Sequence, residues 1–239
     1  MDLSTVQVSF KDAAGVVQQS RLAVAEAGVL AAGRPWRVFR WHRGQAHYSG
    51  WYWSATMGRH VVYESRLELA RLLLADFDRQ VAAIAAQPFL VTAPAEEGRT
   101  RRHVPDFLLV DSDGLVTVVN VKPADRLGDP KVARSLAWAR TVFESRGWRH
   151  EIWSQAPPAV LANVRFLAAY RHRERVPAEL AAWVGGRTAA PVSIAELEAA
   201  WPEQAAGIRS AALHLLWRGD LTADLTRPLS AATVLERAA

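Results

Sequence analysis

The stretch RRHVPDFLLVDSDGLVTVVNVKP, residues 101–123, decides the fold of this chain. Two apolar runs rich in β-branched residues, HVPDFLLV and LVTVVNV, bracket the turn-forming segment DSDG. Runs of this kind on either side of a short Gly-containing turn are typical of a β-hairpin. We therefore predict two antiparallel strands joined by a tight connection.

The length of that connection decides which side chains meet across the hairpin. If residues 112–114 form a three-residue loop, residue 106 lies opposite residue 120, and Gly114 suits the left-handed position that such loops use. A two-residue turn would instead pair residue 106 with residue 121 and point the carboxylate away. The prediction is the three-residue loop or an equivalent bulge.

Three polar side chains then converge at one end of the hairpin. Strand alternation places Asn120 and Lys122 on one face, and the loop brings Asp106 to the same face. Phosphodiester hydrolysis needs a hard cation that polarises water, together with a group that positions the nucleophile. Mg²⁺ accepts carboxylate and carbonyl oxygens, so Asp106, the Val121 carbonyl and the Asn120 amide oxygen are candidate ligands. Lys122 could hold the attacking water or the scissile phosphate.

On the spacing alone, an ordinary hairpin with polar residues at its solvent edge is the better interpretation.

A glutamate on the preceding helix would complete a nuclease active site. Glu64 to about Phe77 has apolar residues at helical spacing, which predicts an amphipathic helix. Glu64, Glu68 and Arg71 share one face of it, ordinarily a solvated face with an ion pair.

The remaining segments complete an α/β core, a mixed sheet flanked by helices. Short strands are expected through Trp53, in TVQVSF, PWRVFRWHRG and AHYSGWYWS. Arg and Trp alternate in the second of these, which fits phosphate and base contacts or, slightly better, a strand with one buried aromatic face. A helix is expected from about Pro130 to Ser145, then a strand in RHEIWSQ and a helix in AVLANVRFLAAYRHRE.

A composition change near VPAELAAWVGGRTAAPVS predicts a domain junction. The first domain is expected over residues 1–178, with a β-rich segment at 1–55 and the core at 56–178. The second, at 186–239, begins with a capping box between Ser193 and Glu196. Short helices followed by the ribbon LTADLTRPLSAATVL give it the outline of a winged helix.

Composition narrows the class of protein. The chain has 239 residues, of which 50% are hydrophobic, and no run is long and uncharged enough to span a membrane. It begins without a signal-peptide pattern and contains no Cys, so we expect a cytoplasmic protein without disulfides or cysteine-zinc sites. The net charge of +5 suits a polyanionic partner. Only three of the 29 basic residues are lysines, and one of them is Lys122.

These residues resemble the PD-(D/E)xK nuclease superfamily. The pattern reads Glu68, then Pro105-Asp106, then Asn120-Val121-Lys122. More specifically, the chain resembles the TnsA-like endonuclease subunits of heteromeric cut-and-paste transposases, in which a neutral Gln often stands where Asn120 does. The stretches SRLELARLLL, AAQPF and VPDFLLV carry the resemblance further, over roughly residues 52–170.

The resemblance implies roles for individual residues. Glu68 and Lys122 would be catalytic, Asp106 would bind the metal together with Asn120, Val121 and Glu68, and Glu64 would be the fallback acid. Gln87, in the "QP" pair, would support the site through hydrogen bonds. A further acid of the family is missing here, because Ala139 lies near its place and Glu144 is the nearest acid.

The resemblance also implies partners and a cofactor. Such a subunit uses Mg²⁺, for which Mn²⁺ is expected to substitute, and cuts the non-transferred strand of double-stranded DNA at transposon ends. A DDE-type transposase subunit cuts and joins the other strand, and an AAA+ ATPase regulator contacts the C-terminal part. No membrane partner is implied.

A basic cluster before Pro105 is the candidate DNA contact. It consists of Arg99, Arg101, Arg102 and His103, which are placed to meet phosphates beside the scissile bond, although solvated loop arginines fit equally well. His60, His103 and His150 have no zinc-like spacing and are expected to be structural.

Two other functions fit the same residues. A stand-alone restriction or repair nuclease would use the same chemistry. A decayed nuclease fold acting as a DNA-binding or scaffolding protein would explain Asn120, since losing a carboxylate removes charge from the metal site. The survival of Asp106, Lys122 and the helix glutamate together argues against decay.

Overall fold

The structure, a computed structural model, describes residues 3–37, 48–95 and 99–238. It divides into two compact units, one of Met1–Asp76 with Gln80–Gln155 and one of Phe77–Arg79 with Ala156–Ala239. The expected first domain included residues 156–178, whereas these residues belong to the second unit. The strand expected in PWRVFRWHRG falls largely outside the described residues and stays a prediction.

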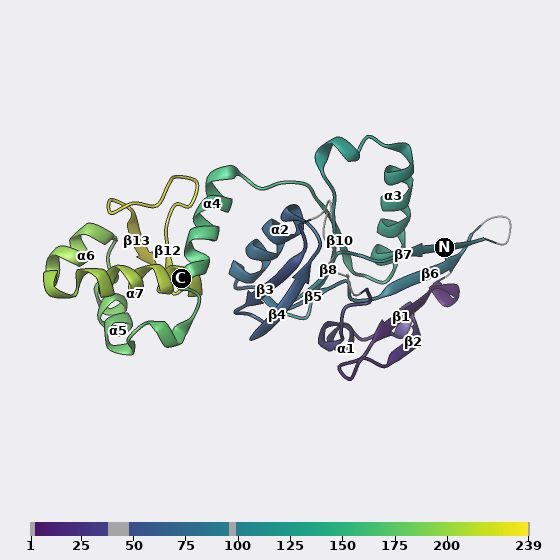
Figure 1. Cartoon of the computed structure of the whole chain (residues 1–239), viewed down its shortest axis with the longest axis horizontal. Coiled ribbons are helices and arrows are strands. Elements are labelled where there is room, and N and C mark those ends of the chain that lie inside the picture. Colours follow the sequence, from purple (N-terminus) through teal and green to yellow (C-terminus); the bar gives the residue numbers. More distant parts are fainter. Residues whose placement is uncertain (1–2, 38–47, 96–98, 239) are drawn as a thin grey trace. The chain divides into compact units, whose positions relative to one another are not determined.

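A four-stranded mixed sheet in the first unit contains the predicted hairpin (Figure 1). Its strand order is β10-β9-β8-β5, with β10 parallel to β9 and the other pairs antiparallel. The strands are β5 (Val81–Ala86), β8 (Phe107–Asp111), β9 (Val116–Val121) and β10 (Arg149–Trp153).

The hairpin register confirms the three-residue loop. Phe107 pairs with Val119 and Val110 with Val116, so residue 106 lies opposite residue 120. Gly114 has φ 80°, the left-handed backbone that the loop requires.

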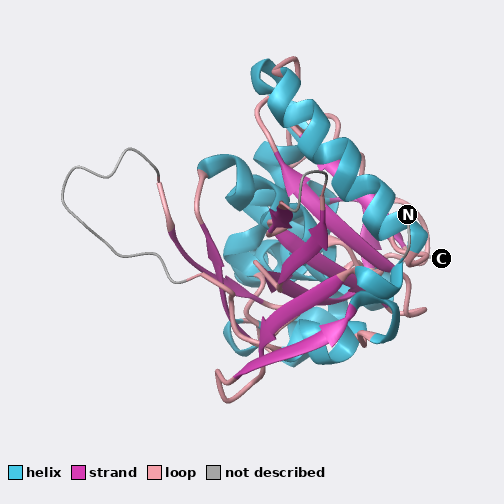
Figure 2. Cartoon of the chain, turned by 90° about the vertical axis from the view of Figure 1, so that its right-hand side faces the viewer, coloured by secondary structure: helices cyan, strands magenta, loops and turns pink. Residues whose placement is uncertain are grey.

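A second four-stranded sheet, of order β2-β1-β6-β7, is antiparallel throughout. It consists of β1 (Gln7–Lys11), β2 (Val17–Arg21), β6 (Leu90–Pro94) and β7 (Thr100–His103). A separate hairpin pairs β3 (Gly50–Ser54) with β4 (Arg59–Tyr63). The described part of residues 1–55 contains β1, β2 and β3 together with the short helix α1 (Ala27–Ala32), and Figure 2 colours the strands magenta and the helices cyan.

The described part of this unit has three α-helices: α1 (Ala27–Ala32), α2 (Arg66–Phe77) and α3 (Pro130–Ser145). The predicted bounds of α3 are confirmed. The Asp129 side chain accepts from Lys131 N, Pro130 occupies the first turn, and Gly147 follows the helix with φ 79°. Helix α2 begins at Arg66, so Glu64 precedes the helix that it was expected to start.

A buried apolar cluster holds the two sheets against α1 and α3. Its largest fully buried side chains include Phe89 and Phe143, whose ring centroids lie 6.0 Å apart. Val116 and Val118 belong to it, so the face of β9 that also carries Asn120 is a core face. Polar residues on that face must find partners inside the protein.

The second unit contains four α-helices and a small sheet. Its elements are α4 (Pro158–Leu167), α5 (Ala178–Arg187), β11 (Val192–Ser193), α6 (Ile194–Ala200), α7 (Ala205–Arg218), β12 (Leu221–Thr222) and β13 (Val234–Arg237). The sheet order is β11-β13-β12. The expected junction is instead helix α5. The predicted capping box of Ser193 and Glu196 is confirmed, and α7 ends at Gly219 with φ 65°.

Short 3-10 turns connect these elements. They are η1 (Leu3–Thr5), η2 (Leu22–Val24), η4 (Ala124–Arg126), η5 (Ala168–Tyr170), η6 (Arg173–Arg175) and η7 (Pro202–Gln204). Within the described ranges, none of the helices has the length and apolar character needed to cross a bilayer.

Candidate active site

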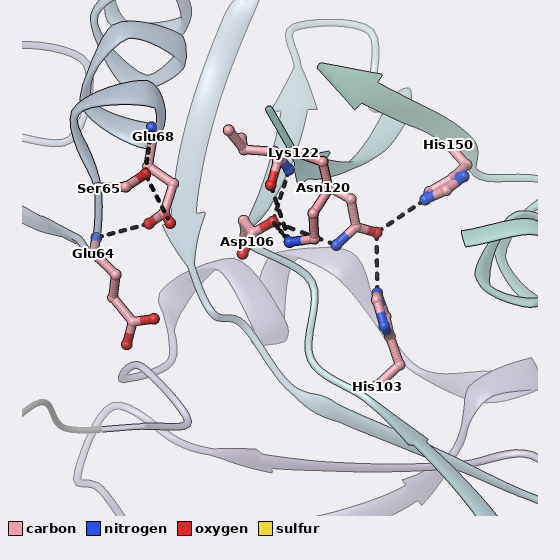
Figure 3. A network of polar contacts seen from close by, with 9 residues as sticks. Glu64, Ser65, Glu68, His103, Asp106, Asn120, Lys122 and His150 are labelled. Carbon is pink, nitrogen blue, oxygen red and sulfur yellow. Dashed lines mark hydrogen bonds and ion pairs between the residues drawn. The ribbon is translucent and has the colours of Figure 1, made fainter. Parts of the chain in front are cut away.

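Asp106 and Lys122 meet at the end of the hairpin (Figure 3). Lys122 Nζ lies 3.7 Å from Asp106 Oδ2, and the side chains are 35% and 16% exposed, respectively. Lys122 Nζ also donates to the Val121 carbonyl at 3.0 Å, while Val121 N donates to Asp106 Oδ2 at 2.7 Å. Of the three side chains predicted to converge, Asp106 and Lys122 therefore lie at ion-pair distance from each other.

The backbone fixes Asp106 from both sides. Its N–H donates to the Val119 carbonyl at 3.0 Å, and its carbonyl accepts from Gln87 N at 2.8 Å. Asp106 thus continues the sheet between β9 and the end of β5 while its side chain stays at the partly exposed edge. The carboxylate is held by strand geometry rather than by a flexible loop.

Asn120 has an arrangement that the sequence did not predict. It is only 1% exposed, and its Oδ1 lies 3.0 Å from both His103 Nε2 and His150 Nε2. Its Nδ2 donates toward Asp106 Oδ2 at 3.4 Å. We expected the amide oxygen to face a metal ion, but in this structure the oxygen faces two histidines and the nitrogen faces Asp106.

Glu68 lies in the first turn of α2 and caps it. Glu64 N donates to Glu68 Oε2 at 2.7 Å, Ser65 Oγ donates to Oε1 at 3.2 Å, and Glu68 N donates to Ser65 Oγ at 3.0 Å. These reciprocal bonds resemble a capping box. Burial raises the pKa of Glu68 from 4.5 to about 7, with the Asp106 charge acting in the same direction against the opposing hydrogen bonds.

The structure also places Glu64, the alternative acid, and Ala139, the position near which the family has a further acid. Glu64 precedes α2, contributes a backbone bond to the Glu68 carboxylate and points its own side chain elsewhere (Figure 3). Ala139 is fully buried, and the nearest acid, Glu144, pairs with Arg140 on α3 at 3.8 Å. No acidic side chain of α3 therefore takes the place of the family acid that is absent near Ala139.

Gln87 contacts the site through its backbone. It is the one described non-glycine residue with positive φ, at 45°, and it is 3% exposed. Its N–H donates to the Asp106 carbonyl, whereas its Oε1 has no hydrogen-bond partner among the described residues. A strained, buried polar residue beside Asp106 is typical of a functional site.

The basic cluster divides into two parts. Arg99, Arg101 and Arg102 are exposed on or just before β7. His103, expected to share their role, points inward to Asn120 and packs 6.5 Å from the Trp138 ring. Burial lowers the pKa of His103, so this imidazole is neutral near pH 7.

Two further residues of this region were not predicted. His150, treated as structural, reaches Asn120 from β10, and burial lowers its pKa to about 4. Arg71, expected on a solvated face, forms a bidentate pair with Glu151 at 2.9 and 2.8 Å. That pair joins α2 to β10. The available signal was a polar residue, Asn120, inside an apolar strand, which requires buried partners.

The donor set fits a hard divalent cation. Asp106, Glu68 and the Val121 carbonyl offer oxygen ligands, and Mg²⁺ is commonly bound by one or two carboxylates while it keeps waters and substrate phosphates. The effect of the Asp106 charge on the pKa of Glu68 is the electrostatic situation that a cation relieves. No cluster of three or more His, Cys, Asp or Glu side chains suited to a metal occurs in the described part of the chain.

Comparison with known families points to the same region. Residues 78–155 match the family described as TnsA-like endonuclease N terminal. The matched segment contains the hairpin, the basic cluster and His150, and it ends where the first compact unit ends. No curated protein matches the chain.

Proposed function

Residues 78–155 form a TnsA-like nuclease domain of the PD-(D/E)xK type, and from that premise we propose that the chain is a metal-dependent DNA endonuclease subunit of a heteromeric transposase. It would cleave the non-transferred strand at transposon ends. The observation that carries the proposal is the Asp106–Lys122 pair at 3.7 Å, because this contact requires the register that brings the candidate residues to one face.

Each residue then has a chemical task. Asp106, Glu68 and the Val121 carbonyl would hold Mg²⁺ or Mn²⁺, which when bound supplies charge neutralisation and an activated water. Lys122 has a partly exposed ammonium with three donors, of which one is used by the Val121 carbonyl. The others can hold the attacking water or a non-bridging phosphate oxygen.

The exposed arginines on and before β7 support a DNA-binding role for this edge of the sheet. Arg101 and Arg102 lie on β7, shortly before Asp106 in the chain, and Arg99 precedes them. Arginine binds phosphate through a planar fork of donors. A net charge of +5 adds a long-range attraction for DNA. We propose that these arginines bind the backbone flanking the scissile phosphate.

The second unit supports a winged-helix-like module. The order helix, short strand, two helices and two-stranded ribbon, with β13 between β11 and β12, is the observation that supports this proposal. In many such domains the helix equivalent to α7 reads DNA. Here every residue from Ala211 to Trp217 is buried, and exposed Arg209 pairs with Glu198 at 2.5 and 2.9 Å.

The connection between β12 and β13 is also fixed. Asn163 of α4 donates from Nδ2 to the Leu225 and Arg227 carbonyls at 2.9 and 2.7 Å, and its Oδ1 accepts from Leu229 N at 3.2 Å. The burial of residues 211–217 of α7 and the fixed connection favour a preformed docking surface over a DNA reader. We propose that this unit contacts the partner subunits, the DDE-type transposase or the AAA+ regulator.

A strand-specific nicking assay tests the proposal. Asp106→Ala should abolish nicking of a transposon-end duplex in Mg²⁺, with and without the proposed partner subunits, while the far-ultraviolet circular dichroism stays unchanged. Asp113→Ala is the matched control, since it removes an exposed carboxylate at the other end of the same hairpin. Undiminished nicking by a clean Asp106→Ala preparation contradicts the proposal.

A DNA-binding scaffold on a decayed nuclease fold is the second candidate. The neutral Asn120, whose oxygen faces away from Asp106, favours it. Calorimetric titration with Mg²⁺ and Mn²⁺, with and without DNA, separates the two. Absence of binding in both states would support the scaffold.

A further inference from the structure

Asn120 links the two four-stranded sheets of the first unit to Asp106. Its Oδ1 lies 3.0 Å from His103 Nε2 on β7 and 3.0 Å from His150 Nε2 on β10. Its Nδ2 lies 3.4 Å from Asp106 Oδ2. The side chain is 1% exposed, so solvent does not compete for these bonds. One amide therefore joins two imidazoles to the principal carboxylate of the site.

The direction of these bonds follows from the two ring nitrogens of each histidine. A neutral imidazole has one N–H and one acceptor nitrogen. His150 Nδ1 is buried and has no hydrogen-bond partner among the described residues. A proton at Nδ1 would be a buried donor without an acceptor, whereas a proton at Nε2 bonds the Asn120 oxygen. The Nε2–H tautomer is therefore favoured at His150.

The Asp106 carboxylate favours the same orientation of the Asn120 amide. If the amide were reversed, its oxygen would face the Asp106 carboxylate oxygen without a proton between them. Two acceptors in that position repel each other and leave a buried polar contact unsatisfied. With the nitrogen toward Asp106, all three contacts of Asn120 pair a donor with an acceptor.

Aromatic side chains of α3 hold the two imidazoles. The His103 ring lies 6.5 Å from Trp138 and 6.3 Å from Phe143, and the His150 ring lies 5.7 Å from Phe143. Phe143 is fully buried. The histidines therefore cannot turn without disturbing the core between α3 and the sheets.

We propose that His103 and His150 are positioning residues, which lock the Asn120 amide so that its nitrogen orients the Asp106 carboxylate and its oxygen stays out of the metal site. This inference rests on the proposed nuclease function. It gives the neutral residue at position 120 a task of its own, to hold one oxygen of Asp106 while the other remains available. Outer residues that orient a ligand typically contribute about 10–100-fold to metal affinity or activity.

The wild-type chain offers a direct test. Long-range ¹H–¹⁵N spectra of the histidine rings should show the Nε2–H tautomer for His103 and His150, before and after saturation with Mg²⁺. If either ring carries its proton at Nδ1, or loses the Nε2–H signal when the metal binds, the proposed lock is wrong. This readout requires neither cleavage nor substitution.

Paired substitutions test the contribution to the metal site. Gln places an amide N–H near the position of His Nε2, whereas Phe keeps a planar ring without a donor. Calorimetry with Mn²⁺ should show binding about 10–100-fold weaker in His150→Phe and His103→Phe, and largely restored affinity in His150→Gln and His103→Gln. His60→Phe, at an exposed histidine of β4, is the control and should bind as the wild type does.

A double-mutant cycle tests whether the effect passes through Asn120. In an Asn120→Ala background, His150→Phe and His150→Gln should bind Mn²⁺ equally, because the amide that they orient is absent. A difference that persists in that background overturns the proposal. Thermal unfolding of each variant identifies any that fail to fold, and the tautomer measurement decides the question for those.

Failure of this inference is distinct from failure of the proposed function. If the wild type binds neither Mg²⁺ nor Mn²⁺, with or without a transposon-end duplex, the nuclease proposal fails and the positioning role fails with it. If the wild type binds metal and folded Phe variants bind it equally well, only the positioning role fails.

Discussion

Asp106 and Lys122 lie at the ends of successive strands with their charged groups 3.7 Å apart on one side of the sheet. Lys122→Ala should lower the single-turnover nicking rate by about 100-fold or more, because it removes the donor for water or phosphate. Lys122→Arg should not restore the rate, since a planar fork replaces a compact ammonium. Lys131→Ala, an exposed lysine of α3, is the control, and equal rates for the Lys122 and Lys131 variants would contradict the role.

The raised pKa of Glu68 predicts a pH-dependent metal affinity. Below about pH 7 this carboxyl carries a proton that the metal must displace. Calorimetric affinity for Mn²⁺ should therefore rise as the pH passes upward through about 7 and level off above that range. In Glu68→Gln the binding should be weaker and its dependence on pH much flatter. An equally steep dependence in this variant would assign the proton to another group.

The same shift predicts an effect on stability without metal. The folded-state pKa lies above the ordinary 4.5, so the contribution of protonated Glu68 is complete below pH 4.5 and is lost as pH rises through about 7. Glu68→Gln retains an oxygen for the cap. Its melting temperature in chelator should exceed that of the wild type above about pH 7, and the difference should shrink toward pH 4.5. A constant difference across that range counts against the burial effect.

The left-handed backbone at Gly114 should make this glycine important for stability. An added Cβ would meet no atom within 4 Å, so a substitution acts through φ 80° alone. Gly114→Val should lower the free energy of unfolding by about 1–2 kcal/mol, because L-residues are disfavoured in left-handed backbone. Gly114→Asn should cost less, and Gly128→Ala, at a glycine without positive φ, should be near neutral. Equal chemical-denaturation midpoints for the three variants would exclude this explanation.

Asp76 should be a structural carboxylate of the first unit. It is 5% exposed and accepts four bonds, from the Tyr52 hydroxyl at 2.7 Å, the Ser54 hydroxyl at 2.5 Å and the Ala55 and Thr56 amides at 3.0 and 2.8 Å. Asp76→Ala leaves these buried donors without a partner, which should cost on the order of 3 kcal/mol in unfolding free energy. Asp125→Ala, at an exposed acid, should change the denaturation curve little.

Arg101 and Arg102 should act through DNA phosphates. Their joint replacement by Ala should weaken binding of a duplex irrespective of its sequence, and should reduce the slope of log affinity against log salt by about 0.9 for each phosphate that the variant no longer neutralises. Arg21→Ala is the matched control, because β2 is the opposite edge strand of the same sheet. Fluorescence anisotropy over a range of salt concentrations measures both quantities, and an unchanged slope excludes the phosphate role.

Local signals predicted the elements that depend on local chemistry. The hairpin loop follows from Gly114, the bounds of α3 from Pro130 and Gly147, and the start of α6 from its capping box. Each of these is decided within a few residues by backbone conformation or capping. The convergence of Asp106 and Lys122 followed from strand alternation once the loop length was fixed.

Long-range packing explains what could not be predicted. The partners of Asn120 are 17 and 30 residues away and lie on strands of two different sheets. Arg71 and Glu151 are 80 residues apart, so nothing near Arg71 in the sequence indicates this partly buried pair. The Ala- and Gly-rich stretch resembled a junction, but burial of Leu180 and Val184 in the second unit makes it helix α5.

The pair of Arg71 and Glu151 affects how the site meets its cation. It ties the helix that carries Glu68 to strand β10, so the scaffold keeps that glutamate near Asp106 even though the Asp106 charge raises its proton affinity. In the proposed nuclease, the two candidate carboxylates would therefore belong to one folded scaffold before DNA arrives.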